Sequence, residues 1–232
     1  MALPTVILPG YLAGAAPYRG MEQQLNSLGF EATTVPLTRG DWWPTLAGRS
    51  MWPILQKLDQ TVTSVLETTG AEQINLVGHS AGGWIARIYL GEKPYAVHRA
   101  DINRQNVWAA YPQVKTLITL GTPHTSQERW TRRNLDFVNG TYPGAFHGSV
   151  NYVCVAGKAI LGKRWRHWFT YNSYAITCGT GDCWGDGITP ISAAHLLGAD
   201  NHVLENVYHS PQPGMTWYGS AEVVPQWARF LT

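Results

Sequence analysis

The chain has 232 residues, enough for one α/β domain with a sizeable core and too few for two ordinary domains. Charged residues make up only 14% of the chain, against about 25% in a typical globular protein, whereas tryptophan is abundant. The formal net charge is +2 and the sequence contains no long block of lysine and arginine, which argues against nucleic acid as a partner.

No apolar run approaches the roughly 18 residues that a membrane-spanning helix needs. Residues 1–4 lack the basic and apolar regions of a signal peptide and lead directly into a predicted strand. The sequence shows no repeats, linkers or low-complexity segments. We therefore expect one domain over residues 1–232, located in the cytoplasm, either free there or peripheral to a membrane.

Short apolar runs alternate with helical patterns along the chain, which is the order of a parallel sheet with right-handed crossovers. The predicted strands cover residues 5–8, 30–36, 73–78, 114–120, 151–155 and 203–207. Apolar residues at helical spacing predict helices at 17–29, 53–70 and 82–90. A C-terminal helix is expected after Ser220, a residue type that is favoured at the N-cap.

Two inserts interrupt this alternation, at about residues 125–150 and 157–185. Both follow strand ends, so we expect them to rise over the edge of the sheet where the carboxyl ends of the strands gather. They carry basic and aromatic residues side by side: Arg129, Trp130, Arg132, Arg133, Lys163, Arg164, Trp165, Arg166, Trp168 and Phe169. Two interpretations stay open, namely adsorption at an anionic lipid surface, or tryptophans packed beneath loops beside solvated arginines.

Ser80 lies at the turn between a strand that ends at Gly78 and a helix that starts at about Gly82. A strand that reverses sharply into a helix strains the central residue and lifts its hydroxyl clear of the sheet. The flanking glycines have no side chain, so strand and helix can approach closely. The helix N-terminus also directs backbone N–H groups at the region where negative charge would develop. This Gly-x-Ser-x-Gly context predicts that Ser80 is a nucleophile.

A serine nucleophile needs a base to remove its proton and a third group to orient that base. Of the eight histidines, His209 alone lies just beyond the last predicted strand, at the sheet edge expected for Ser80. Asp186 lies between two glycines that allow a tight loop to present its carboxylate inward. Asp200 suits a turn, and Asp182 shares the loop of Asp186 as its main rival. The order Ser, Asp, His along the chain is typical of one hydrolase fold.

A tetrahedral oxyanion needs two converging N–H donors, and the loss of one typically costs about 3–4 kcal/mol of barrier. We expect the backbone of Ala81, directly after the nucleophile, to supply one donor, and the backbone of Tyr11, in the loop after the first strand, to supply the other. Segments near the expected site supply four further residues that we predict to bind substrate: Leu12, His79, Trp84 and His124.

Three cysteines do not make a disulfide scaffold. Cys154 is predicted to be a packed thiol in a strand. Cys178 and Cys183 flank a glycine-rich loop close to Asp186, and the sequence leaves open whether they form a bridge. No second Cys or His pair has zinc-like spacing, so we expect neither a metal nor a cofactor.

These motifs resemble those of the α/β-hydrolase superfamily of lipases and esterases across essentially the whole chain. The sequence Leu8-Pro9-Gly10-Tyr11 looks like that superfamily's first-strand loop, with Pro9 where a histidine is usual, and residues 78–83 are similar to its nucleophile elbow. Residues 120–124 resemble a strand end of many triacylglycerol lipases and glycosylphosphatidylinositol deacylases. Four shorter motifs, at 153–157, 184–187, 208–211 and 217–220, resemble a lipase-like branch of plants and cyanobacteria.

The resemblance implies an α/β-hydrolase fold, with a mostly parallel central sheet, helices on both faces and the two inserts over the active site. The narrower match favours Asp186 over Asp182. Together they imply a serine hydrolase that cleaves carboxylic esters through an acyl-enzyme, most simply a lipase or carboxylesterase whose partner is a small-molecule ester or acyl lipid. An acyltransferase or thioesterase with the same residues, and a non-catalytic receptor or binder of the same fold, stay open as alternatives.

Overall fold

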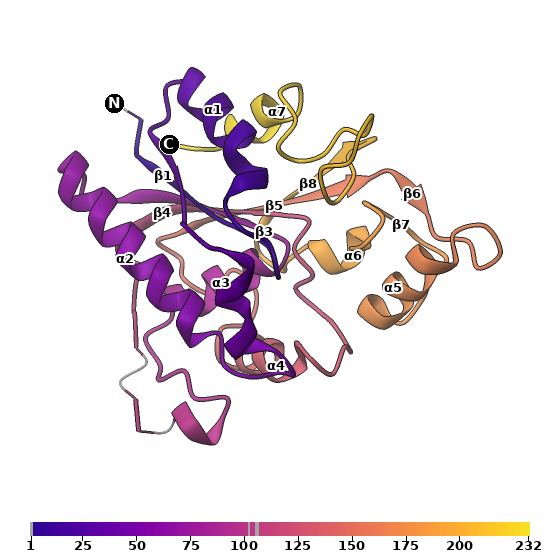
Figure 1. The fold of residues 1–232 in the computed structure, drawn as a ribbon, viewed down its shortest axis with the longest axis horizontal. Helices are drawn as coiled ribbons and strands as arrows, with labels where there is room; N and C mark the ends of the chain where they lie inside the picture. The colour runs from indigo at the N-terminus through magenta and orange to yellow at the C-terminus, as the bar shows by residue number, and fades with distance from the viewer. Residues whose placement is uncertain (1, 102, 105–106) are drawn as a thin grey trace.

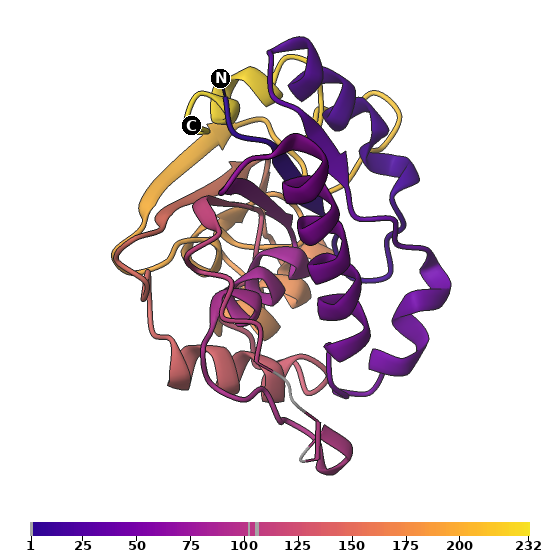
Figure 2. The ribbon, with the colours of Figure 1, turned by 90° about the vertical axis from the view of Figure 1, so that its left-hand side faces the viewer.

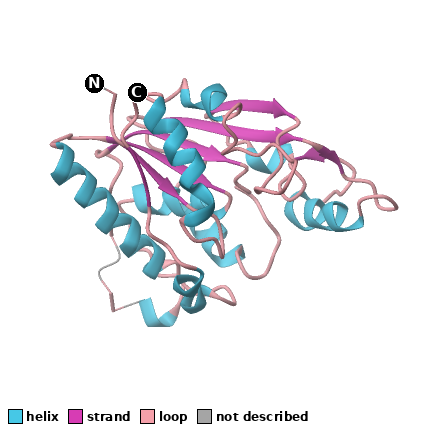
Figure 3. Cartoon of the chain, turned by 45° about the horizontal axis from the view of Figure 1, so that its top comes forward, coloured by secondary structure: helices cyan, strands magenta, loops and turns pink. Residues whose placement is uncertain are grey.

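The computed structural model describes residues 2–101, 103–104 and 107–232. These residues form a six-stranded sheet in the order β2-β1-β3-β4-β5-β8, and each neighbouring pair is parallel. The strands are β1 (Thr5–Leu8), β2 (Ala32–Thr34), β3 (Ile74–His79), β4 (Val114–Leu120), β5 (Asn151–Lys158) and β8 (Asp200–Glu205). Figure 3 shows the strands side by side with their arrowheads toward one side.

Helices connect and cover the strands (Figure 1). They are α1 (Arg19–Ser27), α2 (Trp52–Thr69), α3 (Ala81–Leu90), α4 (Arg132–Thr141), α5 (Trp168–Cys178), α6 (Ile191–Ala194) and α7 (Val224–Ala228), with short 3-10 segments η1 (Ala16–Tyr18), η2 (Arg39–Thr45) and η3 (Arg99–Asp101). A small antiparallel ribbon of β6 (Ile160–Leu161) and β7 (Trp184–Gly185) lies beside α5. Among the described residues, no helix combines the length and the apolar character that crossing a bilayer requires.

The strand order reverses at β1. The chain adds β2 on one side of β1, and then crosses over to add β3, β4, β5 and β8 on the other side. In open parallel sheets such a reversal leaves a crevice at the carboxyl ends of the two central strands, where ligands bind. Here those ends belong to β1 and β3, and the residues that follow them are Pro9 and Ser80.

Alternation along β1 shows how the sheet divides the apolar core. Val6 and Leu8 pack with buried residues of α2, α3 and α4 on one face, whereas Ile7 packs with buried residues of α1 and α7 on the other. Side chains of a strand alternate between faces, so an apolar run such as Thr5–Leu8 is the pattern of a strand covered on both sides. The result is a sheet held rigidly between two apolar layers.

The two ends of the described chain lie close together (Figure 2), and both contact Asn75 of β3. The backbone N–H of Leu3 donates to the carbonyl of Thr232 over 2.8 Å. The buried amide of Asn75 donates to the carbonyls of Leu3 and Thr232 over 3.3 and 3.0 Å, and its oxygen accepts from the Thr232 hydroxyl over 3.1 Å. One polar side chain in the sheet therefore pairs backbone groups from both termini.

The structure confirms the predicted strands at Thr5–Leu8 and Val114–Leu120, and it moves two later elements. The last strand, predicted at 203–207, is Asp200–Glu205, because an edge strand accepts exposed polar residues that apolar patterning does not detect. The C-terminal helix starts at Val224. Ser220 is not its N-cap, since the Ser220 hydroxyl accepts the N–H of Trp217 over 2.9 Å instead.

Removing the amide of Asn75 should weaken the link between the two ends. We expect Asn75→Ala to lower the free energy of unfolding by about 1–3 kcal/mol, because buried backbone groups lose their partners. Urea denaturation measures this change. Asn151→Ala is the matched control, since Asn151 is exposed and its side chain makes no hydrogen bond with a described residue. Equal effects of the two substitutions would contradict the role given to Asn75.

Candidate active site

Ser80 occupies a strained turn between β3 and α3. Its backbone has φ 53° and ψ −126°, a left-handed conformation that serine rarely adopts. A Cβ at Gly78 would lie 2.6 Å from the Cα of Gly83, and a Cβ at Gly82 would lie 2.4 Å from the carbonyl oxygen of Leu8. Glycine is therefore required on both sides of Ser80, because strand and helix approach more closely than any side chain allows.

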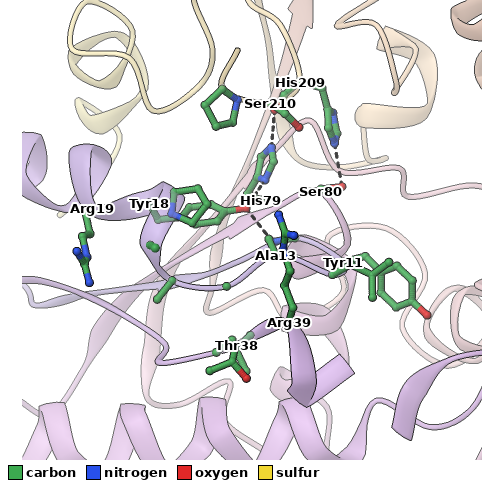
Figure 4. Close-up of a pocket in the computed structure, with 18 of the residues that line it drawn as sticks. Tyr11, Ala13, Tyr18, Arg19, Thr38, Arg39, His79, Ser80, His209 and Ser210 are labelled. Atoms are coloured by element: carbon green, nitrogen blue, oxygen red, sulfur yellow. Dashed lines mark hydrogen bonds between the residues drawn. The ribbon is translucent and has the colours of Figure 1, made fainter. Parts of the chain in front are cut away.

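The structure brings Ser80, His209 and Asp186 together, although they are far apart in the sequence (Figure 4 shows the first two). The Ser80 hydroxyl lies 3.0 Å from His209 Nε2, and His209 Nδ1 lies 2.7 Å from Asp186 Oδ2. A carboxylate accepts only, so the Nδ1–H of His209 donates to it and leaves Nε2 to accept from serine. The three side chains are arranged for proton transfer away from Ser80.

Asp186 is almost completely buried, and four donors satisfy its carboxylate. Oδ1 accepts the backbone N–H groups of Ile188 and Thr189 over 3.0 and 2.7 Å. Oδ2 accepts the hydroxyl of Tyr218 over 2.9 Å in addition to His209. Burial, and then the charge of Asp186, raise the pKa of Tyr218 well above its ordinary value, so this tyrosine remains a donor. The carboxylate is thereby held in one orientation toward the imidazole.

The two predicted oxyanion donors lie beside Ser80. Ala81 is the first residue of α3, so its N–H has no partner within the helix. Tyr11 is the second residue of a turn that the Ala13 N–H closes on the Gly10 carbonyl over 3.0 Å, which leaves the Tyr11 N–H without a partner in the turn. A Cβ at Gly10 would lie only 2.9 Å from the Cβ of Ser80, so this loop passes directly against the serine.

A second buried histidine, His79, connects the loop after β1 to the loop of His209, as the dashed lines of Figure 4 show. His79 Nε2 lies 2.8 Å from the carbonyl oxygen of His209, and His79 Nδ1 lies 2.7 Å from the Tyr18 hydroxyl. That hydroxyl in turn accepts the N–H of Gly10 over 2.9 Å. Burial, and then the neighbouring His209, lower the pKa of His79 to about 3. A neutral ring donates at Nε2 and accepts at Nδ1, which satisfies each of these contacts.

A cavity of about 1020 Å³ opens beside Ser80. It is lined by residues 10–19 and 36–39 and by six residues from elsewhere in the chain: His79, Ser80, Ile188, His209, Ser210 and Pro211. Of the four residues predicted to bind substrate, Leu12 and His79 line this cavity, and so does Tyr11, an expected oxyanion donor. None of the described lining residues comes from 125–150 or 157–185, so the two inserts do not form the wall of this cavity.

Trp84 and His124 belong to the core and not to the cavity, contrary to the prediction. Trp84 has no exposed surface, because its side chain on α3 packs in the core cluster that also contains buried residues of α2. His124 bonds the Thr119 hydroxyl over 3.2 Å and lies 3.4 Å from the guanidinium of Arg87. Burial, and then Arg87, lower the pKa of His124 well below its usual range. Both residues are structural.

The cysteines are free thiols in the described structure. Cys178 and Cys183 lie with their sulfur atoms 3.9 Å apart, close to the loop of Asp186. Cys154 is buried in β5, as predicted, and burial raises the pKa of its thiol to about 11. Within residues 2–101, 103–104 and 107–232, no group of three or more His, Cys, Asp or Glu side chains could hold a metal ion.

Sequence reasoning missed four side chains of the site: Tyr18, Arg19, Arg39 and Tyr218. The Tyr18 hydroxyl bonds His79 and the Tyr218 hydroxyl bonds Asp186. The spacing of residues along the chain does not predict either contact. Tyr218 lies within the motif 217–220, and this resemblance to known sequences is the only feature of the sequence that could have identified Tyr218 as a site residue. Arg19 and Arg39 lie at the starts of α1 and η2, and nothing in the sequence indicates that both line one cavity.

Known structures share this architecture. The chain is similar to the lipase BlEst2 of Bacillus licheniformis in its mature form, with 20% identity, coverage of 100% of this chain and 92% of that chain, and a TM-score of 0.64. It is also similar to the lin2722 gene product of Listeria innocua, with 13% identity, coverage of 99% and 94%, and a TM-score of 0.50. No protein-family profile and no curated protein sequence matches the chain. The chain has the α/β-hydrolase fold.

The Tyr18 hydroxyl should matter for the reactivity of Ser80. Tyr18→Phe leaves the Gly10 N–H and His79 without their shared partner, so we expect the rate of Ser80 labelling by a fluorophosphonate to fall about tenfold. Tyr208→Phe is the matched control, because the Tyr208 hydroxyl has no hydrogen bond to a described residue. Parallel thermal unfolding separates this effect from loss of fold. Unchanged labelling in a folded Tyr18→Phe chain would contradict the positioning role.

Proposed function

We propose that the chain is a serine hydrolase that cleaves carboxylic esters, with Ser80, His209 and Asp186 as its catalytic residues. One observation carries the proposal. A serine in a strained turn bonds a histidine over 3.0 Å, that histidine bonds a buried carboxylate over 2.7 Å, and the serine and the histidine line an open cavity. Such an arrangement supplies a nucleophile, a base and an orienting group in contact with space for a substrate.

The reaction follows from the positions of these groups. Ser80 attacks the ester carbonyl while His209 Nε2 takes its proton, and Asp186 stabilises the resulting imidazolium. The N–H groups of Ala81 and Tyr11 are the proposed donors to the oxyanion. His209 then returns the proton to the leaving alcohol, and an acyl-enzyme on Ser80 remains. Water, activated by the same histidine, releases the acid. None of these steps calls for a metal or a cofactor.

Acyl lipids are the substrate class that we favour, which makes the chain a lipase or carboxylesterase. Most of the cavity lining is apolar, with alanine, leucine and proline residues along 12–17 and 36–37, and this suits an acyl chain. The similarity to a Bacillus lipase is consistent with that choice. The motifs that resemble the lipase-like branch of plants and cyanobacteria point in the same direction. A thioesterase or acyltransferase would use the same three residues with another leaving group or acceptor.

We also propose that the segment 163–169, which joins the end of the loop between β6 and α5 to the first residues of α5, docks on an anionic lipid surface. Its aromatic residues Trp165, Trp168 and Phe169 are 97%, 68% and 68% exposed, so they do not pack beneath neighbouring loops. Lys163, Arg164 and Arg166 stand between and beside them. Aromatic rings that favour the membrane interface, together with cations that form no ion pair with a described residue, make a surface suited to peripheral binding.

Ester hydrolysis tests the catalytic proposal. We expect 4-nitrophenyl esters to be cleaved, and Ser80→Ala to lower kcat about 10⁴-fold or more, because the nucleophile is lost. Ser210→Ala is the control, since Ser210 lines the same cavity and its hydroxyl bonds no described residue. Thioesters of the same acyl chain separate an esterase from a thioesterase. Full turnover by Ser80→Ala would refute the assignment, and a chain that cleaves neither ester nor thioester would be a binder.

Vesicle sedimentation tests the docking surface. We expect the chain to bind vesicles that contain phosphatidylglycerol and to bind phosphatidylcholine alone more weakly, with binding reduced by salt. The pair Trp165→Ala and Trp168→Ala should lower the partition coefficient about tenfold or more. Trp43→Ala is the control, because Trp43 is also exposed but lies on η2. Equal binding by the double variant and the wild type would exclude the segment 163–169 as the contact.

A further inference from the structure

The cavity beside Ser80 has an uncompensated positive charge. Among the described residues that line it, Arg19 and Arg39 are the charged ones, and no carboxylate accompanies them. They lie on the two segments that border the cavity, Arg19 at the end of 10–19 and Arg39 at the end of 36–39. A ligand that binds in the cavity between the two segments would therefore lie near two positive charges.

Neither arginine is neutralised by a neighbouring acid. Asp41 is the nearest carboxylate in sequence to Arg39, but its Oδ2 accepts the N–H and the hydroxyl of Thr38 over 2.7 and 2.8 Å. Its Oδ1 bonds Lys57 Nζ over 2.8 Å. With both oxygens engaged and its charge already balanced by lysine, Asp41 is not available to Arg39. No hydrogen bond or ion pair joins the Arg39 side chain to any residue that the structure describes.

The same holds for Arg19. Glu22 stands three residues later on α1, at a spacing that would suit an ion pair, yet its carboxylate accepts the backbone N–H of Thr34 over 2.8 Å. In the described chain, Arg19 likewise has no acidic partner. Each arginine has a carboxylate nearby in the sequence, but that carboxylate bonds other groups. Both cations can therefore bind an external anion.

Arg39 is the better positioned of the two. Figure 4 shows its side chain extending from the segment of Thr38 toward Ala13 and the Ser80 end of the cavity. Arg19 lies on the far side of Tyr18 in that view. A guanidinium group carries paired N–H donors that fit the two oxygens of a carboxylate or phosphate, and it keeps its charge at every working pH.

On the basis of the proposed ester hydrolysis, we propose that this site selects esters that carry a second, anionic group, and that Arg39 binds that group. The shared chemistry is a carboxylate or phosphate separated from the scissile ester by an apolar spacer. The ester carbonyl lies at Ser80, the spacer contacts the apolar lining and the anion meets Arg39, with Arg19 adding to the attraction. Arg39 is thus a residue that determines specificity, outside the group that transfers protons.

Two esters that differ only at the far end test the preference. Mono-4-nitrophenyl adipate and 4-nitrophenyl hexanoate have the same spacer, but the first ends in a carboxylate and the second in a methyl group. We expect the wild-type chain to show the higher kcat/KM for the adipate, and Arg39→Gln to lower that value about tenfold while hexanoate turnover changes less than about twofold. The advantage should decline as salt is raised.

Arg133→Gln is the matched control, because it removes the same charge from an exposed position on α4, outside the cavity. It should leave the ratio between the two esters unchanged. Turnover of phosphatidylglycerol and phosphatidylcholine in mixed micelles shows whether the anionic group is a lipid headgroup or part of a small ester. Only an enzyme that binds the lipid headgroup should prefer phosphatidylglycerol. If Arg39→Gln leaves the adipate-to-hexanoate ratio unchanged, or if the wild type shows no preference, the inference is wrong while ester hydrolysis still stands.

Binding separates a failure of this inference from a failure of the catalytic proposal. Hexyl phosphate and hexanol can be titrated into Ser80→Ala, which cannot turn over an ester. We expect hexyl phosphate to bind more tightly than hexanol, and Arg39→Gln in the same background to weaken hexyl phosphate binding about tenfold. This result would support the anion site even if no ester were cleaved. Equal binding of the two compounds would overturn it.

Discussion

The close approach of β3 and α3 around Ser80 is the constraint on which the rest of the site depends. A left-handed serine is unfavourable in isolation, and it persists because Gly78, Gly82 and Gly83 allow the surrounding backbone to enclose it. The sheet that anchors this turn is covered by apolar layers on both faces, so the strain cannot relax by local movement. The Ser80 hydroxyl, beside the cavity, therefore has a fixed position, toward which the other groups are oriented.

Hydrogen bonds of buried groups then hold His209 within bonding distance of that hydroxyl. Tyr218 and two backbone N–H groups fix Asp186, while His79 and Tyr18 join the loop of His209 to the loop after β1. This arrangement needs a neutral His79. The folded pKa near 3 lies below the value of about 6.5 in an unfolded chain, so the unfolded chain binds the proton first. The stability contributed by His79 is present above pH 6.5 and is lost as the pH falls toward 3.

Much of the fold and the identity of the central side chains could be predicted from the sequence, because both follow from local patterns. The glycines around Ser80 indicate that strand and helix approach closely there. The position of His209 after a predicted strand indicates that it lies at the same edge of the sheet as Ser80. Trp84 and His124 could not be placed in this way. A residue on a helix after Ser80 can face the cavity or the core, and only the packing of α2 and α3 decides it. The roles of Tyr18 and Arg39 depend on contacts between separate segments, which no single-sequence pattern contains.

The central claim is that Ser80 forms a covalent bond with the acyl group of a substrate. The most direct measurement is to mix the chain with an excess of 4-nitrophenyl hexanoate, quench with acid within the first turnover, and map the acylated peptide by mass spectrometry. The account predicts a hexanoyl group on Ser80, formed at the rate of the first nitrophenol release and lost at the rate of steady turnover. Nitrophenol release with no acyl group on Ser80, or with the acyl group on another residue, would contradict it.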